Sequence, residues 1–375
     1  MIIRNGLVFG QDCVFEKADI AFEGALITKI APPGSLLGEG LDADGAYVLP
    51  GFVDIHTHGC MNSDFCDADP SGLEKMLSCY GKSGVTSVVP ATMAYGEAIL
   101  TGIINAALPY IDKYGFGAAL RGINMEGPFL NVEKRGAQNA ENIIAPDIGI
   151  FDRLYELSGG SIRLLDIAPE TPGAMELIRH ASSKCAVSIA HTSANYNTAI
   201  SAFDAGASHV THLFNAMPPF YHREPGVIGA ASDLAAYVEI ISDGVHLHPS
   251  IVRASFNLFG VSRICLVSDS MRGAGMPNGE YDLGGQPVIL KDGRANLKHG
   301  GAIAGSAMNL ADCCRKAVGF GIPLEDAIRA SCANPAKAVS LDSKVGSLEV
   351  GKNADILIWN NDLSTRAVFS GGERL

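Results

Sequence analysis

The chain has 375 residues, of which 47% are hydrophobic and 18% are charged, and its formal net charge is −12. A chain of this length and composition can bury a large core, and it fits one large α/β domain together with a smaller one. The acidic balance argues against nucleic acid or an anionic membrane as a partner, so an anionic substrate would need a local cluster of hydrogen-bond donors.

The first residues do not read as a signal peptide, because Arg4, Asp12, Glu16 and Lys17 interrupt any apolar core. No run of about 18 apolar residues occurs anywhere in the chain. We therefore expect a cytoplasmic protein. The nine cysteines show no C-x-x-C spacing, so reduced thiols are expected rather than a zinc knuckle.

Short strands separated by glycine turns are predicted at both ends of the chain, over residues 1–47 and 345–375. Between them, over residues 48–344, apolar strand-like runs alternate with amphipathic helical stretches, which indicates βαβ units and a parallel sheet. Eight strands are expected, at residues 47–59, 87–93, 120–129, 163–170, 187–192, 209–215, 237–246 and 263–270. The sequence thus predicts an α/β fold, with a (β/α)8 TIM-like barrel beside a small β-sandwich domain built from both chain termini.

Helices are expected between these strands, each ending near a glycine or a lysine. Examples are residues 72–84, 97–114, 173–184, 197–206 and 250–260. After the eighth strand, glycines punctuate residues 275–300, and this stretch is predicted to form an inserted hairpin.

The stretch PGFVDIHTHG, residues 50–59, places two imidazoles one residue apart. Side chains alternate across a strand, so Asp54, His56 and His58 share one face. Two imidazoles on one face can bind a metal ion, but histidines beside a glycine turn are also common as solvated strand ends. A metal site therefore requires partner ligands elsewhere in the chain.

Such partners occur where a barrel would place them, at the C-terminal ends of its strands. The first strand ends with His56 and His58, and four later strands end with a single imidazole or carboxylate each, at Glu126, His191, His212 and Asp269. These ligand types suit zinc, iron, manganese or cobalt, and a hydrolytic site keeps one position open for water. Convergence of the six groups on one barrel mouth predicts a divalent metal site.

Four other histidines are expected to be structural. His180 and His299 lie on a helix and near a turn and are expected at the surface. His209 faces away from His212 by strand alternation, and His248 lies at the start of a helix.

In their order along the chain, the motifs PGFVDIHTHG, MEGPF, AHT, THLFNAM, SDGVH and LVSDS resemble the amidohydrolase superfamily and, within it, the N-acetylglucosamine-6-phosphate deacetylases. The resemblance covers essentially the whole chain, and MEGPF and THLFNAMPP…REPG are its discriminating parts. It implies hydrolysis of the acetamide of N-acetylglucosamine 6-phosphate, in amino sugar catabolism, by a homodimer with one or two divalent ions per chain.

The resemblance also implies roles for individual residues. A metal ion would be held by Glu126, His191 and His212, and Asp269 would be the catalytic carboxylate. The phosphorylated sugar would contact a further set, made up of Ala137, Gln138, Asn215, Ala216, Arg223, His246 and Ile303.

At two places the sequence differs from that of some members of the family. Gln138 stands where other members carry a histidine that polarises the amide, which leaves the oxyanion-stabilising group open. His56 and His58 are both present, whereas some members have lost one or both, so we expect them to hold a second ion bridged through Glu126. The alternative is that only the first site is filled and that the two histidines bind water.

The chemistry required of such a site follows from the amide bond. A secondary amide is a poor electrophile with a strongly basic leaving group, so a catalyst must polarise the carbonyl, activate water and protonate the nitrogen. A metal ion serves the first two needs, and Asp269 is expected to take a proton from water and deliver it to the nitrogen. Arg223 could bind the phosphate through charge-assisted bonds, although on its own it could equally pair with a surface carboxylate.

Two other functions remain open at this point. Another metal-dependent amidohydrolase, of the cyclic-amidase or deaminase type, would share most of these motifs, and an activity screen would distinguish it. A metal-free barrel that serves as an assembly or binding protein would lack ligands, whereas every expected ligand type is present here.

Overall fold

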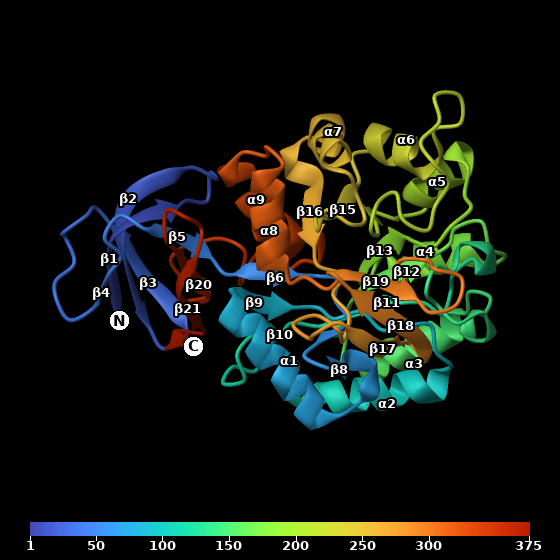
Figure 1. The fold of residues 1–375 in the computed structure, drawn as a ribbon, viewed down its shortest axis with the longest axis horizontal. Coiled ribbons are helices and arrows are strands. Elements are labelled where there is room, and N and C mark those ends of the chain that lie inside the picture. Colours follow the sequence, from blue (N-terminus) through green and yellow to red (C-terminus); the bar gives the residue numbers. More distant parts are fainter.

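The computed structural model describes residues 1–375 and shows two bodies of secondary structure (Figure 1). One is a sheet that contains both ends of the chain, and its eight strands are β1 (Ile2–Phe9), β2 (Phe15–Glu23), β3 (Leu26–Ala31), β4 (Leu41–Asp42), β5 (Tyr47–Pro50), β20 (Ile356–Trp359), β21 (Thr365–Ser370) and β22 (Glu373–Arg374). Within it, β5 pairs in parallel with β1 and antiparallel with β20, so that Leu49 lies opposite Leu357. Strands from the two ends of the chain therefore complete one sheet together.

This sheet has a buried cluster of its own, which includes Ile3, Val48, Ile356 and Phe369. Apart from β5, which extends to Pro50, the strands that supply it come from the two ranges expected to form a terminal β-domain. Strand pairing joins all of them in one sheet. The β-sandwich form of this domain and its boundaries at residues 47 and 345 stay predictions.

The second body is built on parallel strands that follow one another in chain order. They are β6 (Phe52–Asp54), β9 (Val85–Val88), β10 (Ala119–Leu120), β11 (Ile123–Glu126), β12 (Ile162–Ile167), β13 (Ala186–Ile189), β14 (His209–Val210), β15 (Tyr237–Ile241) and β16 (Ile264–Val267). Glycine at position 122, with φ of 153°, separates β10 from β11, which are successive pieces of one strand. A bridge between Ala91 and Asn124 connects the two groups of strands.

The two outer strands of this series also approach each other. Just beyond β16 and β6, the Asp269 amide donates to the His56 carbonyl at 2.9 Å, and the His58 amide donates to the Ser270 carbonyl at 2.8 Å. The arrangement is TIM-barrel-like, with mixed α and β structure as expected. These hydrogen bonds bring the first and eighth strand ends to one place, which is where the sequence predicts the metal ligands.

Each of the eight predicted strand runs overlaps an observed strand, but the first predicted run was too long. Residues 47–59 are divided at Gly51 into β5, which belongs to the terminal sheet, and β6, which belongs to the barrel. A β-carbon at Gly51 would collide with the side chain of Thr86. The chain thus passes between the two bodies at a residue without a side chain.

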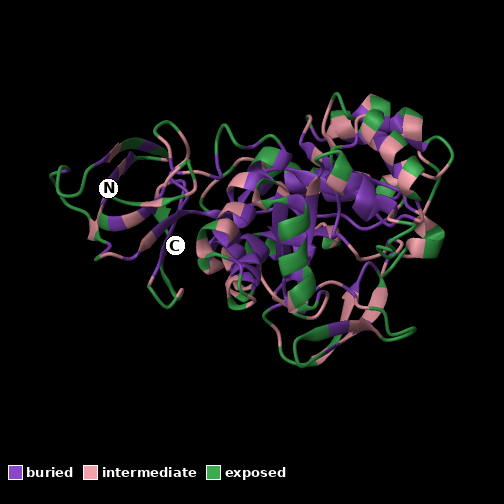
Figure 2. Ribbon diagram, turned by 90° about the horizontal axis from the view of Figure 1, so that it is seen from above, coloured by how far each residue is buried: buried purple, intermediate pink, exposed green.

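Ten α-helices accompany the strands, and many of them combine exposed and buried residues (Figure 2). Their bounds are α1 (Pro70–Ser83), α2 (Glu97–Ala107), α3 (Ile148–Leu157), α4 (Ala174–Ala181), α5 (Tyr196–Asp204), α6 (Gly226–Asp233), α7 (Pro249–Phe259), α8 (Leu310–Gly319), α9 (Leu324–Ser331) and α10 (Ala333–Ala338). The helix predicted at 97–114 ends at Ala107, where a 3₁₀ turn (Leu108–Tyr110) begins. Pro109 explains the early end, because proline lacks the amide hydrogen that would continue the α-helix.

The predicted hairpin at residues 275–300 has a third strand. β17 (Gly279–Leu283), β18 (Gln286–Lys291) and β19 (Arg294–Leu297) form an antiparallel sheet. Two two-residue turns, Gly284–Gly285 and Asp292–Gly293, connect these strands. All four turn residues have positive φ angles, as tight hairpin turns require. The sheet packs through Leu283, Val288 and Leu290 against Met93 and Met271, and this contact places Leu283 beside the barrel mouth.

None of the helices combines the length and the apolar character needed to cross a bilayer. All nine cysteines are free, in agreement with the reduced state expected from their spacing.

Candidate active site

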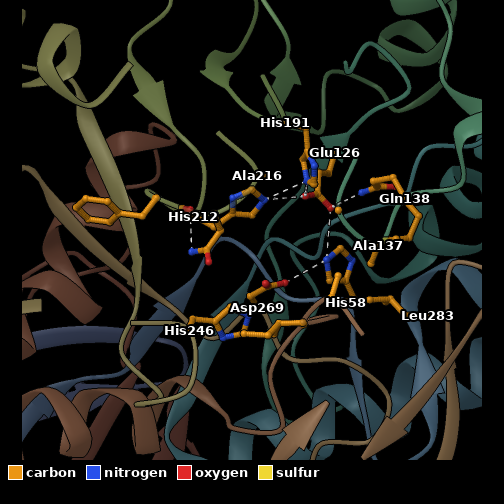
Figure 3. Close-up of a pocket in the computed structure, with 17 residues that line it drawn as sticks. His58, Glu126, Ala137, Gln138, His191, His212, Ala216, His246, Asp269 and Leu283 are labelled. Carbon is orange, nitrogen blue, oxygen red and sulfur yellow. Dashed lines mark hydrogen bonds and ion pairs between the residues drawn. The ribbon is translucent and has the colours of Figure 1, made fainter. Parts of the chain in front are cut away.

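A cavity of about 320 Å³ lies at the C-terminal ends of the barrel strands (Figure 3). It combines titratable groups with small and apolar side chains, and its wall consists of His58, Met93, Glu126, Gly136, Ala137, Gln138, His191, His212, Phe214, Asn215, Ala216, His246, Asp269, Leu283, Ala302, Ile303 and Gly305. Most of the residues proposed from the sequence as site residues therefore meet in one place.

Glu126, His191 and His212 form the first group that could hold a metal ion. Glu126 is the last residue of β11, and the two histidines follow β13 and β14 by two residues. The Oε1 atom of Glu126 lies 3.0 Å from His191 Nε2 and 3.3 Å from His212 Nε2. The two imidazole nitrogens are themselves only 3.1 Å apart, so three potential ligand atoms face one small volume.

The backbone is unusual at several site residues. His191, His212 and Asp269 have φ angles of 43°, 29° and 47°, in a region that residues with a side chain rarely adopt. Hydrogen bonds to backbone carbonyls hold these turns, among them Asn131 N to His191 O at 3.0 Å and Ser306 N to Asp269 O at 2.7 Å. Local strain of this kind concentrates at functional sites, where the surrounding structure maintains it.

A second group, made up of His56, His58 and Glu126, could hold another metal ion. His58 Nε2 lies 3.4 Å from Glu126 Oε2 and 3.3 Å from Asp269 Oδ1, while His56 Nε2 lies 3.6 Å from Glu126 Oε1 and 3.7 Å from Asp269 Oδ1. Glu126 is common to both groups: its Oε1 atom faces His191, His212 and His56, and its Oε2 atom faces His58.

The donor set fits a divalent cation. The Nε2 atom of His56 is buried and has no hydrogen-bond partner, although two carboxylates face it. Four imidazoles and two carboxylates are ligands that zinc and neighbouring transition metals accept. His191 is also held as a metal-binding histidine should be, because its Nδ1 atom lies 2.9 Å from the carbonyl oxygen of Lys134.

The charges of these groups are interdependent. Burial alone raises the pKa of Glu126, but the positive potential of His56 and His58 and hydrogen bonds from His191 and His212 hold that pKa well below its usual range. Burial lowers the pKa of His56, but the carboxylates of Glu239 and Glu126 raise it well above its usual range. Carboxylates that favour a proton on His56 would equally favour a cation beside it.

Asp269 follows β16 and points into the cavity (Figure 3). Burial raises its pKa, but a hydrogen bond with His58 and the charges of His56 and His246 outweigh burial and lower that pKa. The carboxylate is therefore ionised at neutral pH and can accept a proton.

Six of the seven residues expected to contact a substrate line the cavity, namely Ala137, Gln138, Asn215, Ala216, His246 and Ile303. Arg223 does not line it. This residue is exposed, and its guanidinium Nη1 atom lies 2.8 Å from Nε2 of the neighbouring His222. The place of Arg223 in phosphate binding thus stays a prediction.

Gln138 has a specific structural position. Its amide nitrogen donates to Glu126 Oε2 at 3.0 Å, and its amide oxygen accepts from the Ala94 amide at 2.7 Å. The donor that could polarise a carbonyl is therefore engaged with a metal-site carboxylate in this structure.

The four histidines assigned no role at the site occupy varied positions. His180 and His299 are not buried, and His248 caps α7 by accepting from the Ser250 amide. His209, by contrast, is fully buried and lies 3.1 Å from Glu239, so its ring belongs to a polar network beneath the site.

Sequence reasoning gave no role to two carboxylates beneath the site, Asp166 and Glu239. Both are fully buried, in β12 and β15, and burial raises the pKa of Asp166 well above its usual range. Asp54, which the sequence placed on the face of His56 and His58, is likewise buried and has a pKa raised to about 7, mainly by burial. An acidic residue within a mostly apolar strand was the available signal for all three.

A TIM-barrel-like fold that gathers histidines and carboxylates at the ends of its strands is typical of metal-dependent hydrolases. The sequence model of the amidohydrolase family matches residues 47–375. The chain belongs to the amidohydrolase family.

Individual relatives cover nearly the full chain. The N-acetylglucosamine-6-phosphate deacetylase of Bacillus subtilis is 38% identical over 84% of this chain and 81% of that protein. The enzyme of the same name from Lysinibacillus sphaericus is 34% identical over 99% of this chain and 97% of that protein. A solved structure of a mutant N-acetyl-D-glucosamine-6-phosphate deacetylase from Mycobacterium smegmatis, in complex with N-acetyl-D-glucosamine-6-phosphate, has a TM-score of 0.94 and 30% identity, covering 100% of this chain and 98% of that one.

Proposed function

We propose that this protein hydrolyses the acetamide of N-acetylglucosamine 6-phosphate to glucosamine 6-phosphate and acetate. The observation that carries the proposal is the position of Asp269, whose Oδ1 atom faces His58 and His56 beside Glu126 at the wall of one cavity. The names of the relatives supply the substrate. They favour this reaction over that of a cyclic amidase or deaminase.

A divalent ion bound by Glu126 and the histidines would polarise the acetamide carbonyl and lower the pKa of water to about 7. The residues of this chain supply the proton transfers. Asp269, ionised at neutral pH, takes one proton from the attacking water as its oxygen bonds to the carbonyl carbon. It then delivers that proton to the amide nitrogen as the carbon–nitrogen bond breaks, so the sugar leaves as an amine and the acyl group as acetate.

We also propose that both ligand groups bind an ion, with Glu126 shared between them. The geometry supports this because each group offers three ligand atoms within 4.8 Å of one another, and every residue involved is buried. Paired ions in hydrolases lie about 3.5 to 4 Å apart and clamp the reacting oxygens.

The phosphate is expected to lie near His246. This ring lies 2.8 Å from Asp243, and although burial lowers its pKa, the hydrogen bond and charge of Asp243 raise it overall. His246 thus keeps a positive charge to higher pH than a solvated histidine. Asn215 and Ala216 line the same cavity. The backbone amide of Ala216 could donate a further hydrogen bond, whereas that of Asn215 donates to the His212 carbonyl at 2.9 Å.

We make three further proposals, on the domains, the cellular location and the oligomeric state of the protein. Residues 48–344 would form a closed (β/α)8 barrel domain, and residues 1–47 and 345–375 a small β-sandwich domain. The enzyme would act in the cytoplasm as a homodimer. Sedimentation of the purified protein would test the dimer, and limited proteolysis would test the two boundaries.

Acetate release tests the activity. Zinc-loaded protein should release acetate from N-acetylglucosamine 6-phosphate far faster than from N-acetylglucosamine, because only the former offers a phosphate to His246. Cyclic imides and aminated nucleobases serve as the competing substrates, and the galactosamine epimer measures stereochemical tolerance. Faster turnover of a cyclic imide or nucleobase would overturn the proposal.

A further inference from the structure

Beneath the metal ligands, Glu239 occupies the middle of β15 and is fully buried. Its Oε2 atom accepts two hydrogen bonds, one from the ring Nδ1 of His56 at 2.9 Å and one from the backbone amide of His212 at 3.0 Å. Its Oε1 atom lies 3.1 Å from Nε2 of His209. A single carboxylate thus contacts one residue from each of the two metal-ligand groups.

The contact with His56 decides which ring nitrogen faces Glu126 and Asp269. When Nδ1 donates its hydrogen to Glu239, the lone pair of a neutral ring lies on Nε2. This Nε2 atom is the buried nitrogen without a hydrogen-bond partner that faces Glu126 and Asp269. Glu239 therefore selects the ring form and the orientation in which His56 can bind an ion.

The contact with His212 acts on the backbone. His212 has a φ of 29°, which is strained for a residue with a side chain. The Glu239 side chain accepts from the His212 amide, and the Glu239 backbone carbonyl accepts from the next amide, that of Leu213, at 2.9 Å. Glu239 thus holds both successive amides of the turn that presents the His212 ring.

The other two histidines of the proposed ion sites, His191 and His58, are held differently. The Nδ1 atom of His191 lies 2.9 Å from a backbone carbonyl oxygen, and the Nδ1 atom of His58 has no hydrogen-bond partner. Glu239 is consequently a buried carboxylate that supports the ring of His56 directly and the ring of His212 through its backbone. A carboxylate bonded to a ligating histidine ring orients that ring and raises its basicity.

We propose that Glu239 is a positioning residue that fixes His56 in one ion site and His212 in the other, so that its loss weakens both sites together. The inference rests on the two ion sites of the proposed function but not on the substrate. His209 completes the arrangement by engaging the remaining carboxylate oxygen and keeping Glu239 from rotating.

The test measures the affinity of the protein for zinc alone, by competition with a chromophoric chelator and without substrate. Replacing a supporting carboxylate of this kind costs about 10- to 100-fold in metal affinity. In Glu239→Leu, zinc affinity should fall by that factor at the site that contains His56, and it should also fall at the site that contains His212. Glu239→Gln should lose less, because its amide oxygen can still accept from His56 and His212 while its NH₂ group faces His209.

Asp166→Asn is the matched control. Asp166 is also a buried carboxylate beneath the site, but its hydrogen bond comes from Thr211 rather than from a metal ligand. Its zinc affinities should equal those of the wild type. A purely structural role for Glu239 would lower the free energy of unfolding, measured in parallel, and leave zinc affinity unchanged.

Unchanged zinc affinity in folded Glu239→Leu would overturn the inference, as would an equal loss in Asp166→Asn. If Glu239→Leu does not fold, Glu239→Gln decides, and wild-type affinity at both sites of that variant would overturn the inference. Because the measurement involves no substrate, a failure to release acetate would count against the proposed function and leave this inference standing.

Discussion

The Nε2 atom of His58 lies 3.3 Å from the Oδ1 atom of Asp269, which comes from the opposite end of the barrel's strand order. The hydrogen bond from His58 N to Ser270 O fixes the two strand ends relative to each other. A candidate ligand of one ion site is thereby held against the carboxylate that we expect to move the proton. Geometry at the first strand therefore influences chemistry at the eighth.

Asp269→Asn should retain the fold and the bound metal but lose the proton shuttle. The amide is nearly isosteric with the carboxylate but cannot accept and return the proton. General acid–base catalysis contributes roughly 10²- to 10⁴-fold, so kcat should fall by about that factor. Steady-state kinetics with elemental analysis of the same preparation checks the result, and near wild-type deacetylation would show that Asp269 does not carry the proton.

The double variant His56→Gln, His58→Asn should separate the two ion sites. Glu126, His191 and His212 remain as a complete group of three ligands in this variant. Elemental analysis after purification with ample metal should find two ions per chain in the wild type and one in the variant, which should keep some turnover. One ion per chain in both proteins would mean that the two histidines bind water instead.

Gln138→Leu should destabilise the protein. The substitution removes the acceptor of the Ala94 amide, which is buried, and the donor to Glu126. A buried amide left without an acceptor costs about 1 to 3 kcal/mol. Denaturant unfolding of the zinc-saturated proteins measures the difference, and equal free energies of unfolding would mean that the Ala94 amide finds another acceptor.

His246 should make the stability of the protein depend on pH. Its pKa in the folded state is raised above 6.5, so the folded state binds its proton more tightly than the unfolded state. The resulting stabilisation is complete below pH 6.5 and is lost as the pH rises through the raised pKa. His246→Gln removes the titrating group and should therefore remove this dependence.

The comparison requires the free energy of unfolding of both proteins from about pH 5 to about pH 9. The advantage of the wild type should be largest at the acid end of this range and should shrink toward the alkaline end. The opposite trend, or an advantage that does not change with pH, would contradict the assignment of a raised pKa to His246.

The order of strands and the gathering of ligands could be predicted because both depend on local patterns. Each barrel strand is a short apolar run, and Glu126, His191, His212 and Asp269 lie at or just beyond the end of such a run. In a parallel barrel these ends meet at one mouth. Periodicity thus located residues far apart in the chain without any knowledge of their contacts.

Other features depend on tertiary contacts that no local pattern encodes. The division of the first run at Gly51 follows from its approach to Thr86, and the contact of His56 with Glu239 spans 183 residues of sequence. The position of Arg223 in an exposed loop was equally hidden, because its residue type alone fits a phosphate site or a surface pair. The side chain of Arg223 is exposed in this structure, and its part in phosphate binding stays a prediction.

The pairing of β5 with β20 has a consequence for synthesis on the ribosome. One edge of β5 receives its hydrogen-bonded neighbour from residues 356–359, which emerge roughly 300 residues later, and translation at about 5 to 20 residues per second makes that interval many seconds. Throughout it, the nascent chain carries an open strand edge with an apolar face, the kind of surface that invites association between chains. The N-terminal part of the sheet, although made first, therefore completes its strand pairing only after the C-terminal strands have been made.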